Sequence, residues 1–387
     1  MGRILIFTGK GGVGKSSLSA AHARSSALEG KKTLLVSTDM AHNLGDIFSV
    51  QLGKEAKEIA PNLDALEIDP AYVMEHDFQD MMRAIINMIS SERINASDVD
   101  VKLFPGVEEL FSLLKILDIY ESGMYERIII DCAPTGETLA LLKFPELFSW
   151  YIEKLFPIGR VVVKVLAPIS KRAFKLELPG KKAMNDIERL YYRLFELQQL
   201  LKDRETTSVR LVTIPEKMVV EETKRNYMYM NLYDYHVDGV YINRILPQEV
   251  EKTFFDEWIQ IQAKYIKELE ETFSNLPIYR VPWFDTDLNG VEGIDRIVKA
   301  VLDGQDVFAI HDSIAGERYE ENDRGYVMYV TLPFVGKEDV DMHMSGTDII
   351  IKIGNFKRNI PIPNILREYS VVEAKLNNGE LKIQFEN

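Results

Sequence analysis

Short apolar runs alternate with helix-length segments over the first three quarters of the chain. The first run, Arg3–Thr8 (RILIFT), ends in a glycine-rich loop, and a helical stretch over 15–29 separates it from a second run over 33–38. Buried parallel strands have such continuous apolar sequences, and strand, loop, helix and strand form a βαβ unit. Further strands are expected at 63–68, 127–131, 209–214, 236–242 and 278–281. The pattern predicts an α/β fold with a mostly parallel sheet flanked by helices.

Two long helical stretches, 71–122 and 151–203, exceed what a simple strand–helix alternation needs. We expect them to form a helical subdomain at one edge of the sheet. The pattern changes after residue 303, where short alternating segments separated by turns predict an all-β sandwich; they lie at 326–332, 340–344, 348–353, 356–360, 371–376 and 380–385. The predicted organisation is a first domain over 1–303, a charged linker over 304–316 and a β-sandwich over 317–387.

The composition of the chain mainly excludes other classes of protein. Hydrophobic residues make up 46% of the chain and charged residues 27%, as in ordinary globular proteins. The net charge of −14 disfavours general nucleic-acid binding, because an acidic surface repels phosphate backbones. No apolar run approaches the ~18–20 residues that span a bilayer, and the glycine loop at Gly9 leaves no room for a signal peptide. A cytoplasmic location is therefore expected. The single cysteine, Cys132, cannot form an internal disulfide or a multi-cysteine zinc site.

The strongest chemical signal is the segment GKGGVGKSS, which follows the first strand and precedes a helix. It contains the P-loop pattern G-x4-G-K-S in the context that this pattern requires. Glycines let the backbone wrap around phosphate, and successive N–H groups at a helix N-terminus favour anions. Lys15 is expected to reach the β- and γ-phosphates of ATP, and Ser16 to bind Mg²⁺ directly. Lys10 is expected to make a second phosphate contact, in its own subunit or on a partner subunit's nucleotide. The predicted nucleotide-binding residues of the loop are Gly9, Lys10, Gly11, Gly12, Val13, Gly14, Lys15, Ser16 and Ser17.

Three acidic residues follow strands or lie close to one in the sequence. Asp39 follows the second strand, where a carboxylate can orient an attacking water or bind Mg²⁺ through water. Asp46 can serve similarly, although both residues also suit helix N-caps. Asp131 closes the apolar run ERIIID and matches the Walker-B acid, which anchors Mg²⁺ through water. Gly136, in the next loop, can let that loop move with the γ-phosphate.

Three segments in this order, GKGGVGKSS, STDMAHNLGDIF and DCAPTGETLALLKFP, resemble the arsenite-pump ATPase family, which includes the tail-anchored-protein targeting ATPases. The resemblance covers roughly residues 1–303. It implies a nucleotide-sandwich homodimer in which Lys10 reaches across the interface. It also implies a switch I over 39–46, with Asp39 positioning the hydrolytic water, and a switch II from Asp131 to about residue 138.

The resemblance extends to the base end of the nucleotide. It implies that Glu216 contacts the nucleoside, that Asn243 reads the edge of adenine, and that the segment at Pro282 packs over adenine. An amide suits adenine because it both donates and accepts hydrogen bonds. Glu216 also fits a helix N-terminal acid, and Asn243 a turn residue.

Two departures from the family bear on function. Arsenite pumps of this family carry two tandem ATPase halves and a cysteine cluster for metalloid, whereas this chain has one half and only Cys132. The CxxC pair that holds zinc between subunits of the animal and fungal targeting factors is also missing. These departures put direct arsenite transport in doubt and exclude that zinc site.

The C-terminal region resembles the small heat-shock protein, or α-crystallin, domain through YVTLPF at 329–334 and AKLNNGEL at 374–381. A domain of this kind can act on clients or simply support the structure or a dimer. Flexible methionines suit varied apolar partners, so a methionine-rich helical segment is a candidate client surface, with burial in the core as the alternative. Its residues are Met74, Met81, Met82, Ile85, Met88 and Ile89; a second candidate is the apolar stretch 151–173.

The sequence thus predicts an ATP hydrolase that uses ATP and Mg²⁺ to switch a homodimer and handles hydrophobic, membrane-protein clients. One alternative is an ATPase subunit that energises a membrane exporter of arsenite or another anion. A second alternative is a nucleotide-dependent scaffold with negligible hydrolysis.

Overall fold

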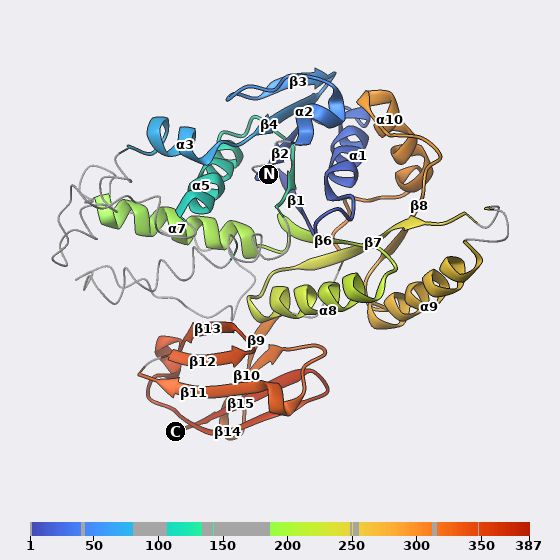
Figure 1. The fold of residues 1–387 in the computed structure, drawn as a ribbon. Helices are drawn as coiled ribbons and strands as arrows, with labels where there is room; N and C mark the ends of the chain where they lie inside the picture. Colours follow the sequence, from blue (N-terminus) through green and yellow to red (C-terminus); the bar gives the residue numbers. More distant parts are fainter. Residues whose placement is uncertain are drawn as a thin grey trace, which may run out of the picture.

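The computed structural model describes residues 2–39, 43–79, 107–133, 142, 186–247, 250, 255–311, 316–346 and 348–387. The first part of the chain forms an eight-stranded sheet with the order β3-β4-β2-β5-β1-β6-β7-β8 (Figure 1). All neighbouring strands are parallel except the pair β3–β4. The strands are β1 (Arg3–Thr8), β2 (Thr33–Ser37), β3 (Lys57–Ala60), β4 (Leu63–Glu67), β5 (Arg127–Asp131), β6 (Thr207–Thr213), β7 (Val237–Ile245) and β8 (Ile278–Pro282).

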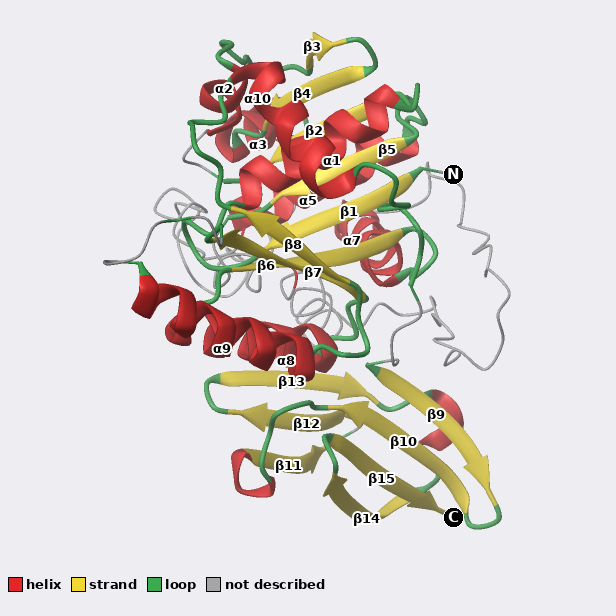
Figure 2. Ribbon diagram, turned by 90° about the vertical axis from the view of Figure 1, so that its right-hand side faces the viewer, coloured by secondary structure: helices red, strands yellow, loops and turns green. Residues whose placement is uncertain are grey.

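Helices cover both faces of this sheet (Figure 2). They are α1 (Lys15–Leu28), α2 (Asn43–Phe48), α3 (Pro70–His76), α5 (Val107–Glu121), α7 (Asp186–Lys202), α8 (Lys217–Leu232), α9 (Asp256–Thr272) and α10 (Gly290–Ile297), which continues as a π-helix over Val298–Leu302. Alternate residues of β1 enter different cores: Ile4 and Ile6 pack with α5 and α7, whereas Leu5 and Phe7 pack with α1 and α10. A strand buried on both faces explains why RILIFT is continuously apolar.

The C-terminal part forms two antiparallel sheets, β14-β15-β10-β9 and β11-β12-β13, which share a buried core. Their strands are β9 (Glu317–Asn322), β10 (Gly325–Thr331), β11 (Val340–Ser345), β12 (Asp348–Ile353), β13 (Phe356–Pro361), β14 (Ser370–Asn377) and β15 (Glu380–Glu386). The predicted fold class, a P-loop-type α/β sheet followed by an all-β region, is confirmed.

The β-sandwich packs directly on α8, as both views show (Figures 1 and 2). The rings of Tyr229 and Phe356 lie 3.7 Å apart between centroids, and Tyr233 Oη donates a hydrogen bond of 3.1 Å to the carbonyl of Lys357. Arg358 donates to the carbonyl of Leu232, the last residue of α8, at 2.5 Å. An aromatic contact and two hydrogen bonds therefore join the two parts of the protein.

The predicted helical stretches and the candidate client residues are only partly covered by the described residues. Helices α3, α5 and α7 lie in the stretches predicted to be helical, but 80–106 and 143–185 fall outside the described residues. The candidate client residues Met81, Met82, Ile85, Met88 and Ile89 and the stretch 151–173 therefore also lie outside them. Met74 is described and is 3% exposed in the main core, as its core interpretation requires. None of the helices in the described ranges is both long and apolar enough to cross a membrane.

Candidate nucleotide-binding site

The P-loop connects β1 to α1 at the centre of the sheet, where β1 lies between β5 and β6. Two of its glycines are dictated by the geometry. A Cβ atom on Gly9 would lie 2.2 Å from the carbonyl oxygen of Val212 on β6. Gly14, the N-cap of α1, has a φ of 97° and no space for a side chain, because a Cβ there would lie 2.2 Å from Nδ2 of Asn243. Only glycine meets both demands without strain.

Lys15 is the first residue of α1 and is 6% exposed. Its ammonium donates a hydrogen bond of 3.3 Å to the carbonyl of Lys10 across the loop. The lysine is thus held against the loop backbone and does not extend into solvent. This places a buried positive charge at the N-terminus of α1, where the helix dipole already favours anions.

Asp131 ends β5 and lies between the ends of β1 and β2, in register with Phe7 on one side and Ser37 on the other. It is 1% exposed. Burial raises the pKa of its carboxyl from the usual 3.8 to about 6; Ser16 and Lys15 lower this pKa, and the negative charge of Asp39 raises it. The structure therefore brings Lys15, Ser16, Asp39 and Asp131 together at the carboxyl ends of the strands.

Two buried polar atoms around this point have no hydrogen-bond partner within the described part of the chain. They are the hydroxyls of Thr8 and Thr38, which end or follow β1 and β2; both carboxylate oxygens of Asp131 are also buried, near the Ser16 hydroxyl. Unpaired buried polar atoms are rare in proteins and call for an explanation such as an ion or water. A hydrated cation bound beside phosphate would satisfy oxygen atoms of this kind. The two threonines were not predicted, although each is a polar residue at the end of an apolar run.

Asp39 and Lys10 are more accessible. Asp39 lies two residues after the end of β2, and its backbone N–H donates to Ser37 Oγ at 3.1 Å, which fixes the turn after this strand. Lys10 is 40% exposed at its side chain and forms an ion pair of 3.7 Å with Glu222 on α8. The sequence gives no signal for this contact, because Glu222 lies far along the chain.

The three residues expected at the base end lie at the carboxyl ends of neighbouring strands. Glu216 follows β6 and precedes α8; it is exposed, and its side chain makes no capping hydrogen bond. Asn243 lies near the end of β7, where Nδ2 donates to the carbonyl of Val13 at 2.8 Å and Oδ1 accepts from the N–H of Arg244 at 2.8 Å. Pro282 ends β8 beside Ile245 and is half-buried.

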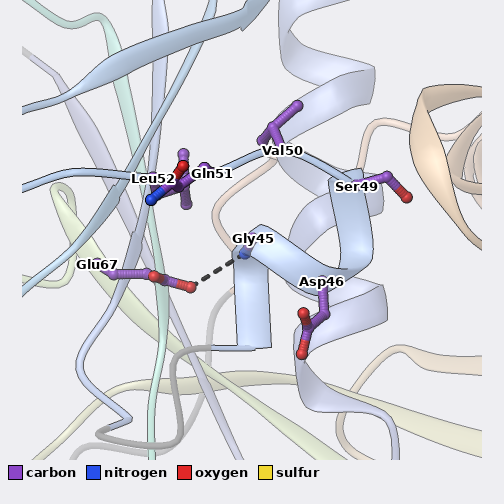
Figure 3. A pocket seen from close by; sticks show the side chains of 7 residues that line it. All are labelled: Gly45, Asp46, Ser49, Val50, Gln51, Leu52 and Glu67. Carbon is purple, nitrogen blue, oxygen red and sulfur yellow. Dashed lines mark hydrogen bonds between the residues drawn. The ribbon is translucent and has the colours of Figure 1, made fainter.

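Asp46 lines an open hollow between α2 and the end of β4 (Figure 3). The hollow has a volume of about 550 Å³ and is lined by Gly45, Asp46, Ser49, Val50, Gln51, Leu52 and Glu67. The N–H of Gly45 donates to Glu67 Oε1 at 3.0 Å and ties α2 to β4. The segments 40–42 of switch I and 134–138 of switch II, including Gly136, lie outside the described residues.

Comparison with known proteins gives two family matches. The model of the anion-transporting ATPase family matches residues 2–303, and that of the HSP20-like domain found in ArsA matches residues 323–385. The putative arsenical pump-driving ATPase 1 of Aquifex aeolicus is 32% identical over 392 residues, which cover 98% of this chain and 99% of that protein. A putative arsenical pump-driving ATPase of Chlorobaculum tepidum is also 32% identical, over 99% of this chain and 96% of its own length. The ATPase get3 of Pyrenophora tritici-repentis is 30% identical over 78% of this chain and 91% of its own length.

Proposed function

The chain belongs to the anion-transporting ATPase family, and from this premise we propose that it uses Mg-ATP to switch a homodimer that binds hydrophobic membrane-protein segments. Family membership confirms the predicted enzyme class, an ATPase. One observation carries the proposal: a buried lysine and a serine at the start of α1 adjoin a buried aspartate, Asp131, and both lower the pKa of its carboxyl. Such an arrangement suits a nucleoside triphosphate with its metal ion.

Mg²⁺ fits the residues at this point. The Ser16 hydroxyl would bind the ion directly, and Asp39 and Asp131 would hold it through water. The buried oxygens of Asp131 and the hydroxyls of Thr8 and Thr38 are the atoms that its hydration shell would satisfy. No group of three His, Cys, Asp or Glu residues in the described ranges forms a metal site alone, so the nucleotide's phosphates would supply further ligands. The bound ion would neutralise charge on the β- and γ-phosphates.

The protein's own groups then account for hydrolysis by positioning and charge stabilisation. The N–H groups of the P-loop and the ammonium of Lys15 bind the phosphates. Asp39 accepts a hydrogen bond from the attacking water and aligns it with the γ-phosphorus. At the other end, Glu216 and Asn243 contact the nucleoside, and the segment at Pro282 packs over adenine.

Lys10 is the group that makes the switch depend on a second subunit. Its ion pair with Glu222 is long, at 3.7 Å, and both side chains are partly exposed. Exposed pairs of this kind contribute about 0–1 kcal/mol, so exchanging Glu222 for a nucleotide phosphate costs little. In the proposed homodimer, Lys10 leaves Glu222 and contacts the nucleotide of the other subunit. ATP thereby closes the dimer, and loss of the γ-phosphate reopens it.

A second candidate function is that of an ATPase subunit energising a membrane exporter of arsenite or another anion. Its support is that two relatives that match over nearly the whole chain are named as putative arsenical pump-driving ATPases. Against direct metalloid binding stands the cysteine content, because the sole cysteine, Cys132, is buried at 1% exposure. In this second candidate the anion would be bound by the membrane partner.

Two variants test the proposed activity. Lys15→Ala is expected to abolish Mg-ATP binding, because it removes the charge that faces the phosphates. Asp39→Asn is expected to bind Mg-ATP normally and to lose turnover, because the amide keeps the shape but not the charge that orients water. Nucleotide titration and phosphate release measure the two effects. Near-normal ATP affinity of Lys15→Ala would refute the phosphate site, and a wild-type protein that binds ATP without turnover would be the scaffold.

Two further measurements distinguish the client-binding function from the exporter function. Asp39→Asn trapped with ATP is expected to co-purify with membrane proteins that carry a hydrophobic segment, whereas Lys15→Ala from the same cells is not. Stimulation of wild-type turnover by arsenite, without client capture, would favour the exporter subunit.

A further inference from the structure

The amide of Asn243 is already engaged by the phosphate loop. Nδ2 donates a hydrogen bond of 2.8 Å to the carbonyl of Val13, in the middle of the P-loop. The same nitrogen fills the space beside Gly14, where a Cβ atom would come within 2.2 Å of it. Gly14 is the N-cap of α1 and directly precedes Lys15. A side chain from β7 thus supports the loop where its phosphate-binding N–H groups begin.

The end of β7 is built to hold that amide in place. Arg244 has a φ of 57°, a left-handed conformation that is uncommon for a residue other than glycine. Two side chains fix it: its N–H donates to Oδ1 of Asn243 at 2.8 Å, and its carbonyl accepts from Nε2 of Gln262 at 3.0 Å. Gln262, which is buried on α9, also accepts from the N–H of Leu246 at 2.9 Å. Unfavourable backbone geometry that is secured in this way often accompanies a functional site.

Among the described residues, the amide uses half of its hydrogen-bonding capacity. A side-chain amide has two N–H donors and two oxygen lone pairs. Val13 takes one donor and Arg244 one lone pair, so one of each remains for the edge of a base. The same group can therefore touch the base and the phosphate loop at once.

We propose that Asn243 is a positioning residue for the P-loop, which links the base pocket to the phosphate site. This inference rests on the proposed nucleotide binding and adds to it. A residue that only reads adenine affects nucleotides and leaves a bare phosphate chain alone. A residue that shapes the loop affects every ligand that the loop binds, with or without a base.

Mg-tripolyphosphate, which has neither base nor sugar, separates the two roles. Its dissociation constant is measured beside those of Mg-ATP and Mg-GTP for the wild type, Asn243→Ala and Asn231→Ala. Asn231→Ala is the matched control, since it removes a buried amide whose Nδ2 also donates to a carbonyl at 2.8 Å, that of Tyr227 within α8, but no contact of the P-loop or of the end of β7. We expect Asn243→Ala to weaken tripolyphosphate about fivefold to tenfold for one lost hydrogen bond, and ATP by at least as much, because ATP also loses the contact to its base. Asn231→Ala is expected to change both by less than about twofold.

The proposal is overturned if Asn243→Ala binds tripolyphosphate as the wild type does, whatever happens to ATP. Lys15→Ala, measured in parallel, distinguishes this failure from failure of the phosphate site itself: unchanged tripolyphosphate binding in Lys15→Ala rejects the proposed function. Thermal unfolding verifies that each variant is folded. Asn243→Ser, whose shorter side chain cannot reach Val13, replaces the alanine variant if that variant is unfolded, with the same expected outcomes.

Discussion

The surroundings of Asp131 disfavour the charged form of its side chain. An aspartate with a pKa near 6 is ionised at neutral pH at the expense of folding free energy, because burial penalises its charge. Above pH 3.8 the unfolded chain loses this proton, whereas the folded protein keeps it until about pH 6. The contribution of Asp131 to stability therefore falls as pH rises through this window, and it stays lost above it. In the proposed function, a charged carboxylate at this position would hold the Mg²⁺ ion, which offsets this penalty.

Asp131→Asn is predicted to stabilise the nucleotide-free protein at pH 8. The difference between a pKa of 3.8 and about 6 corresponds to a gain in the free energy of unfolding of at most roughly 3 kcal/mol. The same variant should bind Mg-ATP more weakly than the wild type. Urea unfolding at pH 5 and pH 8 without nucleotide measures the effect on stability. The exposed Asp323→Asn is the control and is expected to change the stability at neither pH. A variant less stable than the wild type at pH 8 would contradict this account of Asp131.

Other contacts at the residue scale were beyond prediction. The residue types and spacing of GKGGVGKSS indicated a phosphate loop, and the positions of Asp39 and Asp131 placed them beside it. Nothing in the sequence indicated the contacts of Glu222 and Gln262. Both residues lie on helices, α8 and α9, that are far along the chain from the P-loop. Only the fold brings these side chains to the P-loop and to the end of β7.

At the scale of elements, hydrophobic patterning identified most strands, including the edge strands β8, β11, β13 and β14, and missed two others. β1 and β5 have the predicted bounds, since their residues are buried and almost uniformly apolar. β3 (KEIA) and β9 (ERYEEN) were not predicted. Both lie at sheet edges and are largely exposed or half-exposed. An edge strand needs no apolar face, and charge there protects against pairing with other chains.

Helix α1 is anchored to β7 by a histidine that remains neutral. His22 is completely buried; Nδ1 lies 2.7 Å from the carbonyl of Leu18 and Nε2 lies 2.7 Å from Tyr241 Oη. In the neutral ring that fits these partners, Nδ1–H donates to Leu18 and Nε2 accepts from the Tyr241 hydroxyl. Burial is the main reason that the pKa of His22 falls from 6.5 to about 3.

This lowered pKa makes the protein sensitive to acid. The unfolded chain takes up a proton at His22 below pH 6.5, whereas the folded protein does so only near pH 3. Stability is therefore lost as pH falls through this range, by about 1.4 kcal/mol per pH unit from this group. His22→Gln should show a shallower loss between pH 6.5 and 4 in denaturant titrations, while the exposed control His76→Gln should match the wild type. Parallel curves for His22→Gln and the wild type would show that His22 does not titrate in this way.

At the scale of the whole molecule, the β-sandwich and the ATPase sheet share one hydrophobic core. Tyr227 and Met228 of α8 belong to the same buried cluster as Met328 and Ile349 of the sandwich. Arg358 lies between them at 5% exposure and donates to the carbonyl of Leu232 at 2.5 Å and to Glu317 at 2.8 Å. The sandwich is thus fixed to the helix whose Glu222 contacts Lys10.

Arg358→Met is predicted to destabilise the protein by about 1–3 kcal/mol, because it removes the guanidinium that donates to the half-buried carboxylate of Glu317 and to the carbonyl of Leu232. Arg324→Met, which removes an exposed partner of Glu386, should cost less than about 1 kcal/mol. Urea unfolding followed by fluorescence and by circular dichroism measures both values. Since the core is shared, the two probes should give one common transition. Separate transitions for the sandwich and the sheet would contradict the rigid connection.

The central claim is that Lys10 serves the nucleotide of a second subunit, and mixed dimers test it directly. Lys10→Ala and Asp39→Asn homodimers are each expected to be nearly inactive. In a mixed dimer, the Lys10→Ala subunit keeps Asp39, Lys15 and Ser16 and receives Lys10 from its partner, so one site of two works. After equal mixing, about half the dimers are mixed, and roughly a quarter of wild-type phosphate release is predicted if a cation from the partner stabilises the transition state as in other phosphoryl-transfer enzymes. Subunit exchange is verified by a tagged pull-down. Phosphate release no greater than the sum of the two homodimers, despite exchange, would contradict the claim.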